Sequence, residues 1–112
     1  MTMLRFSDLS SSRKALVRLF QKLNFGQIQN LSLRNGEPVF ALPPLVLFDI
    51  KLDNDEGPRP ELNLADFALC DEIRRLVARL DELNNGRIER IEVRGGLPRR
   101  VVIEHRLTER PL

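Results

Sequence analysis

The chain has 112 residues, 42% of them hydrophobic and 30% charged, with a formal net charge of +2. This composition is ordinary for a single soluble globular domain, 1–112. One cysteine excludes an intramolecular disulfide, and the longest apolar run, around residues 40–48, is broken by two prolines and too short to span a bilayer. The N-terminus lacks the basic-then-apolar order of a signal peptide, so we expect a cytoplasmic protein.

The sequence contains one pattern twice, sixty residues apart. Residues 16–39 and 76–99 align without a gap, and nine of the 24 positions are identical. The identities fall on residue types that set backbone shape and core packing, which indicates an internal repeat. We divide the domain into a first repeat, 9–52, a polar linker rich in Pro and Gly, 53–63, and a second repeat, 64–107.

Each repeat is predicted to begin with a helix. Ser10, Ser11 or Ser12 can cap the first helix, and Asp66 or Asp71 the second. The apolar residues at helical spacing are Leu9, Leu16, Val17, Phe20 and Leu23 in the first repeat, and Leu69, Ile73, Leu76, Val77, Leu80 and Leu83 in the second.

A glycine follows each predicted helix, where a left-handed C-terminal cap requires one. These residues are Gly26 and Gly86, and a strand is predicted after each. The core residues that alternate with polar neighbours are Leu31 and Leu33 in the first strand and Ile91 and Val93 in the second.

Turn signals follow both strands, at Asn35-Gly36 and Gly95-Gly96. The returning strands, 46–52 and 101–107, are related by an offset of 55, so the first hairpin carries five extra residues that include Pro43 and Pro44.

Alternation predicts the register of both hairpins. The expected pairs are Ile91 with Val101, Val93 with Arg99, Glu92 with Arg100, Leu31 with Val46 and Leu33 with Pro44. A tight two-residue turn would pair Ile91 with Arg100 and drive an arginine inward, so we expect longer loops, 34–43 and 94–98.

The predicted fold class is α+β, in the order αββαββ. We expect a four-stranded antiparallel sheet with both helices on one face and internal pseudo-two-fold symmetry. Two alternatives remain: the hairpins stack separately, or strands exchange between chains.

The repeat unit resembles the YezD-like family of small bacterial proteins. The residues that carry the resemblance are Phe25, Gly26, Ile28, Asn35, Gly36, Val39, Lys51 and Leu52 in the first copy, and Gly86, Ile88, Gly96, Arg106 and Leu107 in the second. The second copy departs at Asn85, Gly95 and Arg99. The resemblance implies a fused tandem of a single αββ unit. That family has no established activity, some members are associated with sulfur assimilation, and no catalytic residue can be transferred from it.

No residue pattern points to an enzyme, a metal site or a cofactor. His105 occupies the place of Ile50 and is predicted to be structural, and Cys70 is predicted to be a small buried residue. A Cys70–His105 nucleophile–base pair is the enzymatic alternative. The acidic cluster Asp53, Asp55 and Glu56 lacks the further ligands of a calcium loop and fits a solvated linker.

Two surfaces are candidates for binding. Apolar residues expected outside the core mark a possible interface: Leu19, Leu45, Leu47 and Val102. A loop around Pro43-Pro44 could instead cover them. Arginines of the second repeat form a possible nucleic-acid strip: Arg87, Arg90, Arg94, Arg99 and Arg100. We therefore expect a non-enzymatic binding or regulatory module that forms a homodimer or binds a protein partner, with nucleic-acid binding as the alternative.

Overall fold

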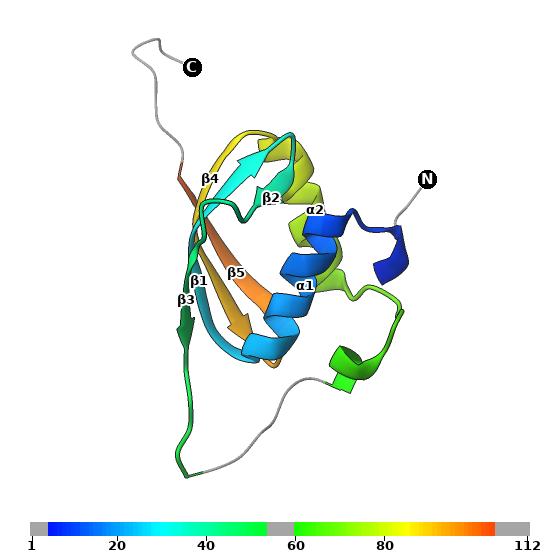
Figure 1. Ribbon diagram of the computed structural model, residues 1–112, viewed down its shortest axis with the longest axis vertical. Helices are drawn as coiled ribbons and strands as arrows, with labels where there is room; N and C mark the ends of the chain where they lie inside the picture. The colour runs from blue at the N-terminus through cyan, green and yellow to red at the C-terminus, as the bar shows by residue number, and fades with distance from the viewer. Residues whose placement is uncertain (1–4, 54–59, 105–112) are drawn as a thin grey trace.

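The computed structural model describes residues 5–53 and 60–104. Two helices lie on one face of an antiparallel sheet (Figure 1). This confirms the predicted α+β class. The helices are α1 (Ser11–Leu23) and α2 (Asp71–Leu83), the strands are β1 (Phe25–Arg34), β2 (Glu37–Val39), β3 (Leu45–Phe48), β4 (Gly86–Arg94) and β5 (Leu97–Glu104), and two short 3₁₀ turns are η1 (Phe6–Asp8) and η2 (Pro60–Asn63).

Within the described residues the sheet has five strands instead of the predicted four. Its order is β2-β1-β4-β5, and β3 also pairs with β1. Residues 32–34 of β1 pair with β2 and residues 26–29 pair with β3, both on the edge that β4 does not use. The predicted returning strand, 46–52, forms only over Leu45–Phe48, and the additional strand β2 lies inside the predicted loop 34–43. Because β1 pairs directly with β4, one continuous sheet forms, and the hairpins do not stack separately.

The first hairpin turns at Asn35-Gly36 alone, where both residues have positive φ, 54° and 75°. The observed pairs are Arg34 with Glu37, Leu33 with Pro38, and Ile28 with Val46. The predicted pairs Leu31 with Val46 and Leu33 with Pro44 are wrong. The extra residues interrupt the returning strand instead of lengthening its tip, so the predicted loop 34–43 is also wrong.

The second hairpin combines two features that we expected to exclude each other. A two-residue turn at Gly95-Gly96 joins the strands, and the predicted pairs Ile91 with Val101 and Glu92 with Arg100 are confirmed. A register shift after Glu92 reconciles them, because Arg99 is the extra residue of a β-bulge. Val93 consequently pairs with Pro98, and the predicted pair of Val93 with Arg99 is wrong.

The helix starts follow the capping prediction in one case only. The Ser10 hydroxyl accepts a hydrogen bond from the Arg13 amide at 3.3 Å and caps α1. Cys70 occupies the N-cap position of α2 without a side-chain bond to the backbone. Asp66 therefore does not cap that helix, and Asp71 is its first residue, where its charge suits the helix dipole.

Asparagines, not the predicted glycines, occupy the C-cap positions of the two helices, with φ near +60°. Asn24 has φ 61° and Asn84 has φ 59°. Gly26 has a different role, since a Cβ there would lie 2.0 Å from the carbonyl oxygen of Leu47 on β3. At Gly86 a Cβ would meet nothing closer than 3.7 Å. Gly26 is thus needed for the close approach of β3 to β1.

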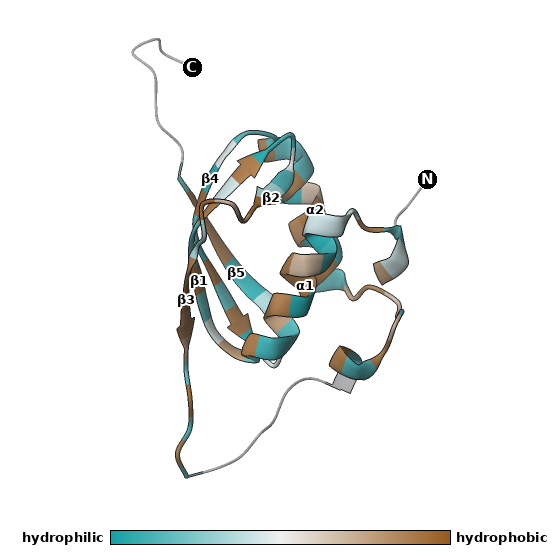
Figure 2. Cartoon of the chain, in the orientation of Figure 1, coloured by the Kyte–Doolittle hydropathy of each residue, from teal (hydrophilic) through white to brown (hydrophobic). Residues whose placement is uncertain are grey.

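The main core lies between the helices and the sheet. Most of its residues are those that the periodicity predicted, Ile28 and Ile88 join them, and hydrophobic and hydrophilic residues alternate along β1 and β4 (Figure 2). The buried set is Leu16, Phe20, Leu23, Ile28, Leu31, Leu33, Leu76, Leu80, Ile88, Ile91 and Val93.

Each hairpin tip is bonded to the end of a helix from the other half of the chain. The Gly36 amide donates to the Asn84 carbonyl at the end of α2, at 2.5 Å. The Gly96 amide donates to the Asn24 carbonyl at the end of α1, at 2.9 Å. The two halves therefore exchange backbone hydrogen bonds as well as core contacts.

Arg13 ties both helices to the first hairpin although it is buried, with 5% of its surface exposed. Its guanidinium donates to the Gly36 carbonyl at 2.9 and 3.2 Å and to Asp81 on α2 at 2.6 Å. Glu37 lies 3.5 Å away and also accepts hydrogen bonds from Ser10 and Ser12. Burial alone would raise the pKa of Glu37, but the two serines and the Arg13 charge outweigh it and lower that pKa.

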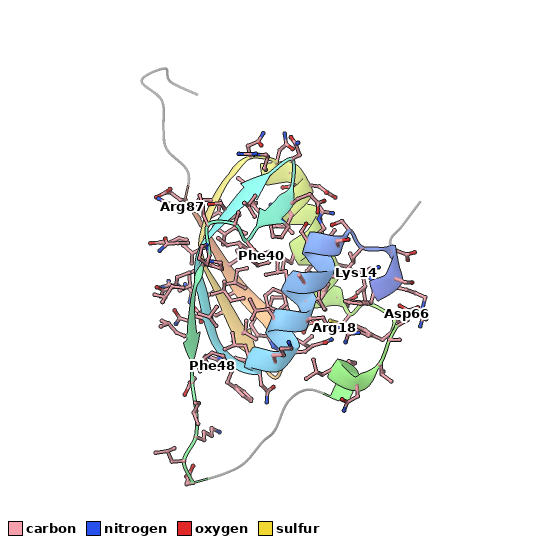
Figure 3. All side chains as sticks on the ribbon, viewed as in Figure 1. Lys14, Arg18, Phe40, Phe48, Asp66 and Arg87 are labelled. Atoms are coloured by element: carbon pink, nitrogen blue, oxygen red, sulfur yellow. The ribbon has the colours of Figure 1, made fainter. Side chains whose placement is uncertain are left out.

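A second, smaller cluster covers the outer side of the helices. Phe6 stacks on Phe67 with 4.9 Å between ring centroids, and the Arg18 guanidinium lies 4.3 Å from the Phe6 ring (Figure 3). Arg18 also donates to the Glu61 carbonyl of η2 at 2.9 Å. Part of the predicted linker, residues 60–63, is therefore bound to α1.

Candidate functional site

The open face of the sheet carries the side chains that point away from the helices. Two cross-strand rows run over it, Leu47–Gln27–Glu92–Arg100 and Leu45–Gln29–Arg90–Val102. The β3 end of both rows is apolar, the two middle strands are polar or charged, and the β5 end is Arg100 in one row and Val102 in the other. Apolar surface is therefore concentrated at β3, which is uniformly hydrophobic (Figure 2).

β3 has an open edge in the described part of the chain. The Asp49 amide donates to the Phe25 carbonyl at 2.8 Å, so the backbone groups of Asp49, and of Leu47 and Leu45 at two-residue steps before it, point towards β1. Because backbone groups alternate along an antiparallel strand, the N–H and C=O groups of Val46 and Phe48 point away from β1. They are available to a further strand.

The side chains at this edge are exposed on both faces of the strand. The exposed fractions are 52% for Leu45, 41% for Leu47 and 59% for Phe48. Ile50, which follows the strand, is 70% exposed. We call Leu45, Leu47, Phe48 and the outward backbone groups the β3 edge.

A hollow of about 210 Å³ adjoins the β3 edge. Leu47 and Phe48 form one side of it, and Glu92 and Arg94 of β4 contribute to its lining.

The structure separates the four predicted interface residues. Leu45 and Leu47 lie together on β3, whereas Val102 lies on β5, at the other end of the same row as Leu45. Leu19 is half-buried and packs against the main core from α1. The grouping of Leu19 with the sheet residues is therefore wrong, because its helix lies on the opposite sheet face from Leu45.

The five predicted nucleic-acid arginines do not form one strip. Arg87 and Arg94 lie at opposite ends of β4, seven residues apart, or roughly 23 Å at the rise of a strand. Arg90 and Arg100 flank Glu92 on the open face, and Arg99 turns to Glu72 on α2. Arg87 is bound by both carboxylate oxygens of Glu104, at 3.0 and 3.1 Å.

The remaining candidates form no catalytic or metal centre that the structure describes. Cys70 is half-buried beside the cluster of Phe6 and Phe67. His105, Asp55 and Glu56 lie outside the described residues, so the Cys70–His105 pair is not placed. Among the residues that the structure does describe, no group of three or more His, Cys, Asp or Glu side chains could hold a metal.

Asp66 is a polar residue whose role sequence reasoning missed. Its carboxylate accepts hydrogen bonds from Arg5 Nε at 2.7 Å and from the amide and hydroxyl of Ser7 at 2.9 and 3.2 Å. The Arg5 bond, followed by the Ser7 amide, lowers the pKa of Asp66 to about 2. Asp66 thereby fastens the N-terminal segment to the chain before α2.

The chain was compared with protein-family models, with curated proteins and with solved structures, and nothing matches it. None of the helices in the described ranges is long and apolar enough to cross a membrane.

Proposed function

We propose that this chain is a non-enzymatic binding module that self-associates by pairing two β3 edges. The observation that carries the proposal is an edge strand with exposed apolar side chains on both faces and outward backbone groups that no other described strand pairs. Edge strands of monomeric proteins are usually protected by charges or prolines within the strand. Leu45–Phe48 contains neither.

A second copy of the chain is the best occupant of this edge. Two antiparallel β3 strands related by a two-fold axis present the same residues to each other, which gives a closed dimer. The outward groups of Val46 and Phe48 would supply the backbone hydrogen bonds. Leu45 and Leu47 would pack against their copies on the open face, and the hollow beside Phe48 would accept a partner side chain.

The oligomeric state and its dependence on Leu47 test this proposal. Sedimentation equilibrium at micromolar to sub-millimolar concentration should show a monomer–dimer equilibrium, and Leu47→Lys should shift it to monomer because a charge would be buried in the pairing. Leu64→Lys is the matched control, since Leu64 is also an exposed leucine, at 49%, but lies just after η2. A wild-type protein that stays monomeric at the highest concentration contradicts the proposal, as does equal loss in both variants.

We also propose that the two halves are copies of one αββ unit related by a pseudo-two-fold axis, as the resemblance to YezD-like proteins implies. Two sets of contacts support it. Ile28 pairs with Ile91 and Leu31 with Ile88, so each pair becomes the other under the sixty-residue offset. The exchange of bonds between hairpin tips and helix ends has the same reciprocity.

Nucleic-acid binding is the weaker candidate. Arg87 is occupied by Glu104, and Arg90 and Arg100 share Glu92, so acids interrupt any path of arginines across the open face. A cytoplasmic location fits either function and is part of the proposal.

A further inference from the structure

A second hollow, of about 190 Å³, lies between α2 and β5. Its lining includes Arg75 and Arg79 from α2, Arg99 and Arg100 from β5, and a single acid, Glu72. We call it the arginine groove. Arg75 and Arg79 are four residues apart and so share one helix face. The β-bulge at Arg99 accompanies the turn of this side chain towards Glu72 on α2, whereas Arg100 borders the hollow with its side chain beside Glu92 on the open face.

The groove carries more positive charge than its own acid can balance. Arg99 donates to Glu72 at 2.6 Å, which leaves Arg75 and Arg79 of α2 without an acid among the lining residues. Arg79 reaches Glu82 at 3.1 Å, in a pair with both side chains more than 60% exposed, and Arg100 lies 4.0 Å from Glu92. Such exposed pairs contribute little and are easily exchanged for another anion. Within residues 5–53 and 60–104, no ion pair is formed by Arg75.

We infer that the arginine groove binds a phosphomonoester, that is, a terminal phosphate dianion on a small molecule. Guanidinium groups match phosphate oxygens with paired hydrogen bonds, and the two positive charges of Arg75 and Arg79 suit a dianion better than a singly charged carboxylate or phosphodiester. Buried Leu76 in the lining offers an apolar surface to the body of the ligand.

A compact ligand fits better than a nucleic-acid strand. A strand needs net positive charge that continues beyond the groove, and on the open face Arg87 and Arg90 each lie beside an acid, Glu104 and Glu92, so the charges there balance locally. The inference does not depend on self-association, because the groove involves β5 and α2 and the proposed dimer involves β3.

Calorimetric titration of the full chain at low salt tests the inference, with phenyl phosphate as the probe and benzoate and a random single-stranded oligonucleotide as comparisons. Phenyl phosphate should bind saturably. Arg75→Gln and Arg79→Gln should each weaken it about tenfold or more, as expected for the loss of a charge-assisted hydrogen bond. Arg74→Gln is the matched control, an exposed arginine on α2 outside the groove, and should change the affinity less than about twofold.

Urea midpoints equal to that of the wild type would show that the exposed variants remain folded. The inference is overturned if phenyl phosphate does not saturate, if benzoate binds as tightly, or if Arg74→Gln weakens binding as much as Arg75→Gln. It is also overturned if the oligonucleotide binds more tightly than phenyl phosphate and Arg87→Gln weakens it, because the ligand would then be a nucleic-acid backbone.

Discussion

Replacing Arg13 with Met should lower the free energy of unfolding by about 3 kcal/mol. The Arg13 side chain is 6% exposed, and two nitrogens of its guanidinium donate hydrogen bonds to the Gly36 carbonyl. Met keeps the apolar stem that packs between the helices but removes every donor. The cost therefore measures the polar contacts and not a cavity.

The magnitude follows from the partners that remain. The buried carbonyl of Gly36 loses two donors, which costs about 1–3 kcal/mol. Asp81 is 61% exposed and regains water, so its lost bond adds only ~0–1 kcal/mol. Glu37 keeps its hydrogen bonds from Ser10 and Ser12 but loses a nearby positive charge. A loss of about 3 kcal/mol corresponds to a fall in Tm of roughly 10–20 °C for a domain of this size.

Urea unfolding followed by circular dichroism measures the effect, with Arg74→Met as the control on the exposed side of α2. The control should stay within about 0.5 kcal/mol of wild type. If Arg13→Met also stays within about 1 kcal/mol, the desolvation of the guanidinium offsets its hydrogen bonds, and the reasoning about Gly36 is refuted.

Two further predictions concern β3 and acid. Gly26→Ala should destabilise the protein more than Gly86→Ala. Both glycines have positive φ, 155° and 146°, but only at Gly26 would a Cβ lie 2.0 Å from the Leu47 carbonyl oxygen. Amide hydrogen exchange at β3 should rise in Gly26→Ala alone, and equal stability of the two variants would contradict this prediction. Asp66 contributes stability at neutral pH that is lost as the pH falls below its ordinary value of 3.8 and through its folded pKa of about 2. Asp66→Asn should therefore flatten the pH dependence of Tm in this window, and an unchanged slope would contradict the assignment.

The periodic part of the fold could be predicted from the sequence. The apolar stripes located both helices, and alternation paired Ile91 with Val101. The details that failed are those where two local rules compete. The turn chemistry of Gly95-Gly96 and the alternation of the strands are satisfied together only by an extra residue, and nothing in the sequence marks Arg99 as that residue.

The sequence predicted a candidate binding surface only where the exposure of single residues was enough to identify it. Leu45 and Leu47 stand out as apolar residues on the polar side of a strand, and they are exposed as expected. Arg13 looks like any surface arginine, because its partner Asp81 is 68 residues away in the sequence. The arginine groove was missed for the same reason, since Arg75 and Arg79 meet Arg99 only after the chain has folded.

Because of the bonds between hairpin tips and helix ends, each half supplies a hydrogen-bond donor to the C-terminal end of the other half's helix. A half on its own would leave the last carbonyl of its helix, at Asn24 or Asn84, without the donor that the opposite tip provides. It would also leave the edge of its long strand, β1 or β4, without the partner strand that the other half provides. A chain cut between residues 53 and 60 should consequently give two fragments that fold only together. The stability of the folded pair would then depend on the fragment concentration.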